Sequence, residues 1–307
     1  MANIIDNISY KWKTGTWLIK IIFINIAIFL FLRVWSLIGF FANLPTYSWI
    51  EWIQCPSSLP TLASHPWTIF SYMFAQYDVL HILFNMIWLY SFGRLFLEFN
   101  SQKQLLALYV YGGIMGAIIF MLGYNFLPVF NNTQGWLIGS SASVIAIVIA
   151  TAILNPEYKV GLLFIGQISL KWIAIITLTI FLLGLSGENS GGHMAHFGGA
   201  LAGAIYGMMM RKGVDITAPF NKMLDNFANL YYAIKDFKIS HRKAPKAKRW
   251  DNTNSNTKQY SASTKATATP EDNATLDAIL DKIKKSGYTA LSAEEKKRLF
   301  DVSKRIK

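Results

Sequence analysis

Long runs of apolar residues, separated by short polar stretches, fill the first two thirds of the chain. An α-helix rises ~1.5 Å per residue and the hydrocarbon core of a bilayer is ~30 Å thick, so these runs have the length of membrane-crossing helices. The pattern predicts six helices, over residues 16–40, 79–97, 104–124, 139–155, 170–186 and 191–210. The fourth and fifth are short, and we expect them to be tilted or partly buried by their neighbours. The sequence therefore predicts an all-α membrane protein built on a six-transmembrane-helix bundle.

The last third of the chain has a different pattern. Residues 211–238 mix apolar and charged positions at helical spacing, which predicts an amphipathic juxtamembrane segment. Residues 239–275 carry few large apolar side chains, which is typical of a disordered linker. Residues 276–307 hold two short helical patterns, and Ser292 with Glu295 is a capping-box signature at the start of the second. A small helical hairpin and a solvated tail both remain open for this end.

Basic residues in the short loops predict the orientation of the helices. Loops that contain Lys or Arg alternate with loops that contain none at successive crossings up to residue 210. By the positive-inside rule, this alternation places both chain ends on the cytoplasmic side. We therefore expect a cytoplasmic N-terminus over residues 1–15, a membrane domain over 16–210 and a cytoplasmic tail. The expected location is a cell (inner) membrane, which the chain crosses several times.

Composition and charge narrow the class of protein further. Hydrophobic residues make up 53% of the chain and charged residues 15%, which excludes an ordinary soluble domain. The net charge is +12, and 21 of the 29 Lys and Arg residues follow residue 210, as expected for a segment that faces anionic lipid. No nucleic-acid-binding fold is recognisable, so nucleic acid is not an expected partner. The single cysteine, Cys55, excludes an internal disulfide and a cysteine-based metal site.

Three polar clusters interrupt the apolar helices and are the candidate functional residues, because polar groups inside a membrane are costly. The clusters lie in VLHILFNMIW of the second helix, GSSAS of the fourth and GGHMAHFGG of the sixth. These three helices are predicted to run in the same direction, so their polar residues fall at a similar depth. If the helices are neighbours, four side chains converge: His81, Asn85, Ser141 and His196.

A serine and a histidine that converge predict a catalytic pair, in which the imidazole takes the hydroxyl proton and makes the oxygen nucleophilic. Gly199, Gly203 and Gly207 follow His196 at intervals of four, and such a stripe of small residues lets two helices approach closely. The close approach would bring the histidine to the outer end of the neighbouring helix. No carboxylate third member is evident, so a dyad is the simpler interpretation. His193 and His196 alone are a weak metal signature, and no metal is predicted.

The ordered set of motifs resembles the rhomboid intramembrane serine proteases: H-x-x-x-N in the second helix, G-x-S-x at the fourth and A-H-x-G-G-x-x-x-G in the sixth. The resemblance covers roughly residues 16–210, including the number and orientation of the helices. It implies that Ser141 is the nucleophile and that His196 is the general base and then the acid for the leaving amine. It also implies an oxyanion hole made by His81, Asn85 and the backbone N–H of the serine.

The same motif contains a glycine and two departures from the family pattern. Gly139 would allow the close backbone turn before the nucleophile. Ala142 stands where the family usually has glycine, and Ile145 stands where many members have an aromatic residue that packs on the histidine. We expect tighter packing from Ala142 without loss of activity, and we expect the departures together to affect the rate and the loop geometry more than the chemistry. Ser140 and Ser143 are rival nucleophiles by proximity, and the motif register favours the serine between them.

The resemblance implies that the substrates are other membrane proteins, cut within the bilayer in or near a transmembrane segment. The fifth helix with its loops is the expected gate, and neither a cofactor nor a metal is implied. Two other functions remain open. The first is a catalytically inactive scaffold that binds transmembrane segments, which the intact serine–histidine pair argues against. The second is a proton-linked transporter that uses His81, His193 and His196 as a path, which the lack of an intramembrane carboxylate makes less favourable.

Overall fold

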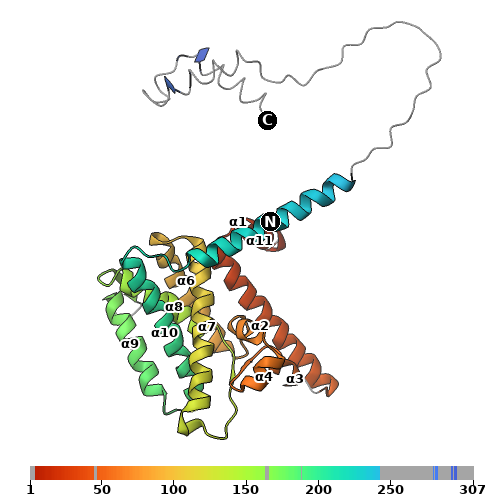
Figure 1. Cartoon of the computed structure of the whole chain (residues 1–307), viewed down its shortest axis with the longest axis vertical. Helices are drawn as coiled ribbons and strands as arrows, with labels where there is room; N and C mark the ends of the chain where they lie inside the picture. The colour runs from red at the N-terminus through yellow and green to blue at the C-terminus, as the bar shows by residue number, and fades with distance from the viewer. Residues whose placement is uncertain are drawn as a thin grey trace, which may run out of the picture. The chain divides into compact units, whose positions relative to one another are not determined.

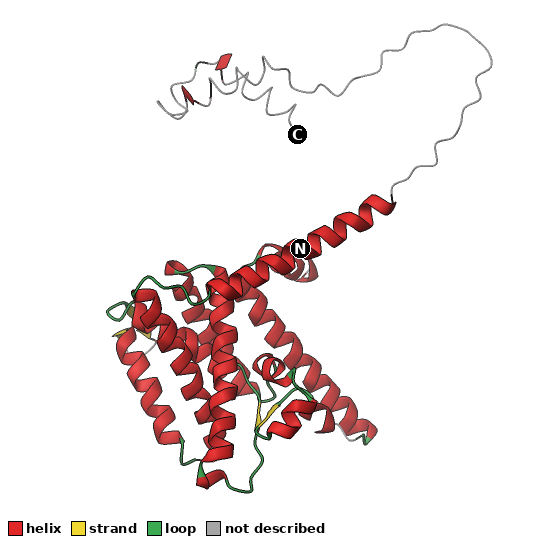
Figure 2. Ribbon diagram, in the orientation of Figure 1, coloured by secondary structure: helices red, strands yellow, loops and turns green. Residues whose placement is uncertain are grey.

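The computed structural model describes residues 4–44, 47–162, 166–187 and 189–242, together with residues 279, 281, 282, 292, 294 and 295. The chain divides into two units, Met1–Lys243 and Ala244–Lys307. The first unit is a bundle of helices with two small pieces of β-sheet (Figures 1 and 2).

Six long helices lie at the six positions that the apolar pattern predicts. Their bounds are α2 Trp17–Ala42, α6 Val79–Phe99, α7 Gln102–Phe126, α8 Ser141–Leu154, α9 Leu170–Gly184 and α10 Ser190–Arg211. Within the described part of the chain, α2, α6 and α7 are long and apolar enough to cross a membrane, whereas α8 and α9 are apolar but shorter. The chain is therefore a mostly helical protein with three candidate membrane spans, and the count of six spans stays a prediction.

The remaining elements are short, apart from one helix that follows the bundle. They are α1 Ile4–Thr14, α3 Tyr47–Glu51, β1 Cys55–Pro56, α4 Leu59–Ser64, α5 Thr68–Ser71, the 3-10 turns η1 Tyr72–Phe74 and η2 Pro128–Phe130, β2 Trp136–Leu137, β3 Lys159–Leu162, β4 Gly166–Ser169 and α11 Ala218–Arg242. Strands β1 and β2 pair antiparallel with Cys55 opposite Leu137, and β3 pairs antiparallel with β4. The first pairing matters for the site, because β2 leads directly into α8.

Helix α8 forms the centre of the bundle. Every residue from Ala142 to Ala152 is buried, as expected for a helix that is apolar on all sides. Helices α6, α7 and α10 surround it, while α9 lies at one edge of the bundle and α2 at the other (Figure 1). Side chains on the outer faces of α2 and α9 are large, apolar and exposed, which fits surfaces that contact lipid. The centre of the bundle therefore holds the helix whose first turn carries the serine cluster.

Glycines on α10 set its distance from α8. A Cβ atom at Gly199 would collide with the backbone oxygen of Ala142, and one at Gly203 would collide with the backbone oxygen of Ala146. A Cβ at Gly207 would lie 2.9 Å from the Cβ of Ile153. We call this row of Gly199, Gly203 and Gly207 against α8 the glycine seam. The two helices thus pack backbone against backbone, a contact that larger residues would prevent.

Helix α11 extends to Arg242, so the first residues of the segment predicted as a linker are helical. The helix continues because its apolar and charged residues keep their helical spacing past residue 238. The rest of the predicted linker, from residue 243 to 275, lies outside the described residues.

In the second unit, the described residues include both hydrogen bonds of the predicted capping box. The Glu295 N–H donates to Ser292 Oγ at 3.2 Å, and the Ser292 N–H donates to Glu295 Oε2 at 2.7 Å. The Lys282 ammonium donates to the other carboxylate oxygen at 2.8 Å, which links the two helical patterns. Most of the predicted hairpin lies outside the described residues.

Candidate active site

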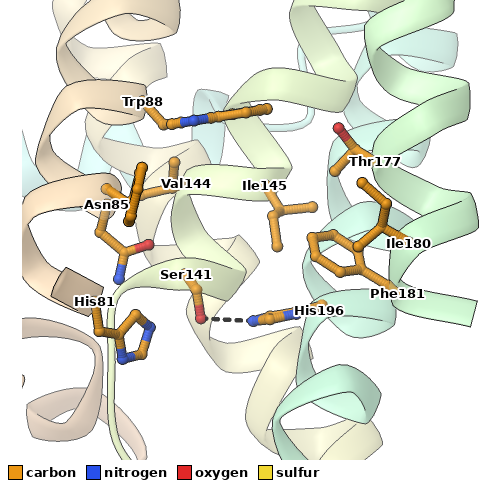
Figure 3. A pocket seen from close by; sticks show the side chains of 11 residues that line it. His81, Asn85, Trp88, Ser141, Val144, Ile145, Thr177, Ile180, Phe181 and His196 are labelled. Carbon is orange, nitrogen blue, oxygen red and sulfur yellow. Dashed lines mark hydrogen bonds between the residues drawn. The ribbon is translucent and has the colours of Figure 1, made fainter. Parts of the chain in front are cut away.

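A pocket of about 240 Å³ opens between α6, α8, α9 and α10 (Figure 3). Its walls are mostly apolar, and its polar groups lie within the first two turns of α6, α8 and α10, apart from Thr177 on α9. The lining residues are His81, Phe84, Asn85, Trp88, Ser141, Val144, Ile145, Thr177, Ile180, Phe181 and His196. The four side chains that the sequence motifs predicted to converge are therefore all on the surface of one pocket.

Ser141 and His196 are in direct contact. Ser141 is the first residue of α8, and its Oγ lies 2.8 Å from Nε2 of His196 (Figure 3). When the hydroxyl donates to Nε2, the ring proton of a neutral histidine sits on Nδ1. This Nδ1 is buried and has no hydrogen-bond partner among the described residues. The nearest acid in sequence, Glu188, lies outside them, so the described site contains a serine–histidine dyad without a carboxylate.

The glycine seam brings these two residues to the same level. His196 lies one turn before Gly199, and Ser141 precedes Ala142, whose backbone oxygen faces that glycine. Ala142 is itself buried, with its Cβ close to Gly116 on α7. Because α7, α8 and α10 all meet at this point, a small residue after the serine is needed here, and alanine provides it.

An aromatic ring packs on His196, and it comes from α9. The centroid of Phe181 lies 4.4 Å from that of His196, with 49° between the ring planes. Ile145 lines the pocket on α8, at the position where the resemblance places an aromatic residue in many family members. Sequence reasoning missed Phe181, because the rotation of one apolar helix about its axis cannot be read from a run of apolar residues.

His81 and Asn85 line the opposite wall of the pocket, on α6. The Asp78 carboxylate caps this helix by accepting from the His81 backbone N–H at 2.8 Å. Gly139 has a φ of +129°, and a Cβ there would lie 2.8 Å from Cε1 of His81. Glycine therefore permits both the turn before Ser141 and the close approach of the imidazole to the chain.

The other serines of the cluster point away from the pocket. Ser140 Oγ accepts a hydrogen bond from Nε2 of Gln76 at 3.1 Å and is fully buried. Ser143 faces α7, where a Cβ at Gly113 would lie 2.9 Å from its Oγ. Of the three serines, only Ser141 lines the pocket and reaches the histidine.

His193 does not line the pocket. Its ring meets that of His196 edge to face, with centroids 5.4 Å apart, and its far side lies against Gly184 on α9. No group of three or more His, Cys, Asp or Glu side chains gathers into a metal-binding arrangement in the described ranges. The histidine pair therefore packs as a contact between α9 and α10.

Comparison with known proteins gives two family matches. A rhomboid domain model matches residues 63–213, and a model of a family of unknown function, DUF6576, matches residues 270–305.

Three similar proteins have the word rhomboid in their names. Presenilin-associated rhomboid-like protein A, mitochondrial, from Danio rerio is 31% identical over 142 residues, which cover 43% of this chain and 34% of the relative. RHOMBOID-like protein 12, mitochondrial, from Arabidopsis thaliana is 27% identical over 157 residues, or 48% and 47% of the two chains. Presenilin-associated rhomboid-like protein, mitochondrial, from Homo sapiens is 25% identical over 139 residues, or 43% and 35%.

The matched region of this chain spans only about a third to a half of the length of these relatives. Their names contradict the expected location in a cell inner membrane, because each of them is named as a mitochondrial protein. That expectation was wrong for a physical reason. Loop charges report the direction in which helices cross a bilayer, and they carry no information on which membrane it is.

Proposed function

Because this chain belongs to the rhomboid family, we propose that it is an intramembrane serine endopeptidase that cleaves transmembrane segments of other membrane proteins. The observation that carries the proposal is the 2.8 Å contact between Ser141 Oγ and His196 Nε2 on the wall of an apolar pocket. Such a distance lies within the range in which an imidazole activates a hydroxyl as a nucleophile.

In the proposed reaction, Ser141 Oγ attacks the carbonyl carbon of the scissile peptide while Nε2 of His196 takes its proton. The new C–O bond gives a tetrahedral intermediate, and its C–N bond breaks as the imidazolium returns the proton to the leaving amine. Water then attacks the acyl ester with the same histidine as base, which releases the acid product and restores the serine. The bundle must therefore admit one water molecule per turnover.

The negative charge on the intermediate is proposed to be held by His81, Asn85 and the backbone N–H of Ser141. The N-terminal end of α8 adds free N–H groups and the positive end of the helix dipole at the same place. Fixed donors in an apolar pocket stabilise such a charge more strongly than water does, because they need no reorientation during the reaction.

The dyad would work without a carboxylate to hold the imidazolium. Packing takes over the orienting role in this proposal, since Phe181 covers one part of the ring and His193 meets another. The proton on Nδ1 stays in an apolar environment, so the charged ring is costly and should lose its proton quickly to the leaving amine.

The surroundings of the pocket favour a transmembrane segment as substrate. The walls from Trp88, Ile145 and Ile180 are apolar, and the outer faces of α6 and α9 beside them carry exposed apolar side chains. We propose that the six long helices all cross the lipid bilayer, with both ends of the bundle on one side. The names of the relatives point to a mitochondrial membrane.

An inactive scaffold is the second candidate, because the same pocket could bind a transmembrane segment without cutting it. The proton-linked transporter has less support. Its path would need His81 and His193 to share a cavity, and His193 lies against Gly184, away from the pocket that His81 lines.

The test compares purified wild type with Ser141→Ala, His196→Ala and Ser143→Ala in detergent. Each protein is treated with a fluorophosphonate probe and, separately, with a transmembrane reporter substrate. Wild type and Ser143→Ala should label and cleave, because Ser143 faces α7, whereas the other two variants should do neither while remaining folded. A wild type that neither labels nor cleaves any reporter supports the scaffold, and cleavage by Ser141→Ala would refute the assigned nucleophile.

A further inference from the structure

We propose that Gln76 is a positioning residue that fixes the side-chain amide of Asn85, so that its N–H, and not its oxygen, is available to the oxyanion. The inference rests on the proposed proteolytic function and deepens it. Gln76 lies in the segment between η1 and α6, nine residues before Asn85, and no sequence motif includes it.

Gln76 lies in a buried polar network that joins three helices. Its Oε1 accepts a hydrogen bond from Asn85 Nδ2 at 2.8 Å, and its Nε2 donates to Asn25 Oδ1 at 3.0 Å and to Ser140 Oγ at 3.1 Å. The Gln76, Asn25 and Ser140 side chains are fully buried, and Asn85 is 8% exposed. Water cannot replace these bonds, so breaking any of them leaves a buried polar group without a partner.

The direction of every bond in this network is determined, because the network ends on backbone carbonyls that can only accept. The Tyr109 hydroxyl donates to the carbonyl of Met73 at 2.7 Å, so its oxygen must accept from Asn25 at 3.2 Å. Asn25 therefore directs Nδ2 to this hydroxyl and to the carbonyl of Ile21, which leaves its Oδ1 as an acceptor. Gln76 must therefore donate to this oxygen from its Nε2, which turns its Oε1 toward Asn85.

The fixed orientation of Gln76 determines which atom of the Asn85 amide faces the proposed oxyanion. With Oε1 of Gln76 facing it, Asn85 must place Nδ2 there, and Figure 3 shows this nitrogen on the side of the amide that faces His81. Among the described residues Nδ2 makes this one hydrogen bond, so its second N–H is available to a ligand in the pocket. A flipped amide would present a carbonyl oxygen to the developing negative charge, which would repel it.

The network also ties the two walls of the site together. Gln76 bonds Asn85 on α6 and Ser140 immediately before the nucleophile, so one side chain spans both. Only an amide offers an acceptor on one side and two N–H groups on the other at this size. An ionised glutamate could not donate at all, and a methionine of similar shape offers only a weakly accepting sulfur and no donor.

Burial of Gln76 would also fit a merely structural role, so the test must separate a positioning role from a structural one. We would measure kcat and KM on a transmembrane reporter for wild type, Gln76→Met, Asn85→Ala and the double variant, with Gln167→Met as the matched control at an exposed position on β4. We expect Gln76→Met to lower kcat by about 10- to 100-fold, below the ~10²–10³-fold that loss of a whole oxyanion donor costs, with KM changed less than about twofold.

The double variant gives the decisive comparison. If Gln76 acts through Asn85, Gln76→Met should lower kcat by less than about twofold in the Asn85→Ala background, because interacting residues are not additive. An equal loss in both backgrounds, or a folded Gln76→Met with wild-type kcat, overturns the proposal. Thermal unfolding monitors folding, and Asn25→Leu is a second variant for the same cycle if Gln76→Met does not fold.

Failure of the proposed function itself gives a different result, since wild type would then neither cleave nor label. The amide orientation can still be measured in that case, from the ¹⁵N side-chain signals of asparagine-labelled protein in detergent. One of the two Asn85 side-chain protons should be shifted by its hydrogen bond in wild type and lose that shift in Gln76→Met. Identical Asn85 signals in the two proteins would refute the positioning role without any activity assay.

Discussion

The ring of Phe181 on α9 lies against the ring of His196 on α10, with 4.4 Å between their centroids. In many members of the family the resemblance implies such a ring on the helix that carries the serine, and this chain has Ile145 at that position. The aromatic partner thus comes from the helix that was expected to act as the gate. The orientation of the histidine therefore depends on where α9 lies.

Substitution of Phe181 should lower the rate more than it weakens substrate binding. An aromatic contact contributes about 0.5–1.5 kcal/mol beyond the area it buries, which corresponds to about 2- to 10-fold in rate. We expect Phe181→Leu to lower kcat by that factor. Phe181→Tyr, which keeps the aromatic ring, should retain most of the wild-type kcat. Leu182→Ala, at an exposed position on the same helix, is the control. Equal kcat losses in Phe181→Leu and Leu182→Ala would show that the ring contact has no such role.

Gly199→Ala should damage both stability and activity. The added methyl group would meet the backbone oxygen of Ala142, and overpacking of this kind costs about 1–3 kcal/mol. The strain would move α10 away from α8 and lengthen the Ser141–His196 contact. Thermal unfolding in detergent and fluorophosphonate labelling measure the two effects. Gly161→Ala on β3 is the matched control, because nothing lies within 4 Å of the position of its new Cβ.

Gly139→Ala should lower activity by displacing His81. Its φ of +129° is unfavourable for alanine, and the strain is about 1–3 kcal/mol. The new Cβ would also contact the imidazole, so the chain must shift at the wall proposed to hold the oxyanion. We expect a loss in kcat greater than the loss in thermal stability accounts for. A folded Gly139→Ala protein with wild-type kcat would contradict this.

Asp215, in the connection after α10, should make stability depend on pH. Burial acts to raise its pKa, but hydrogen bonds from Thr217 and Gln104 outweigh burial and hold the pKa of Asp215 below its usual value. A carboxyl whose pKa is lowered by folding stabilises the protein above its unfolded pKa of about 4 and loses this contribution as the pH falls through the folded value. Asp215→Asn should therefore be less stable than wild type at neutral pH, and the gap should close in acid.

Thermal unfolding over a pH series measures this gap. Asp6→Asn, at an exposed position on α1, is the control for removing one carboxylate. A difference between wild type and Asp215→Asn that stays constant from neutral pH to below about pH 4 would contradict the assignment of the pH dependence to this residue.

The sequence predicted the helices well because their signal is local. Each long apolar run can be identified as a helix from its own residues alone, and the observed helix bounds differ from the expected ones by a few residues. The motif residues could also be singled out, since a histidine or serine inside an apolar run is conspicuous. Their convergence on one pocket depends on helix packing, and here the glycine seam gave the useful clue, because only a close neighbour explains a row of glycines.

Gln76 and Phe181 could not be predicted, for opposite reasons. Gln76 lies in a polar, irregular segment, where a glutamine suggests solvent exposure, and only the packing of α2, α6 and α8 around it makes it buried. Phe181 is one apolar residue among many on α9, and its contact depends on the rotation of that helix. The end of α11 was missed by four residues because its charged and apolar residues continue without a break.

The glycine seam has a consequence for how the protein should respond to its bilayer. Across the seam, backbone lies against backbone, so α8 and α10 are in closest contact with each other at Ala142 and Ala146. Helix α9 lies at the edge of the bundle, and its outer side chains are exposed. With α9 crossing the bilayer as proposed, a thinner or thicker membrane should tilt this helix first and leave the spacing across the seam unchanged. Lipid thickness would then control how readily a substrate enters and, through the Phe181 contact, how the His196 ring is oriented, while α8 and α10 stay in close contact.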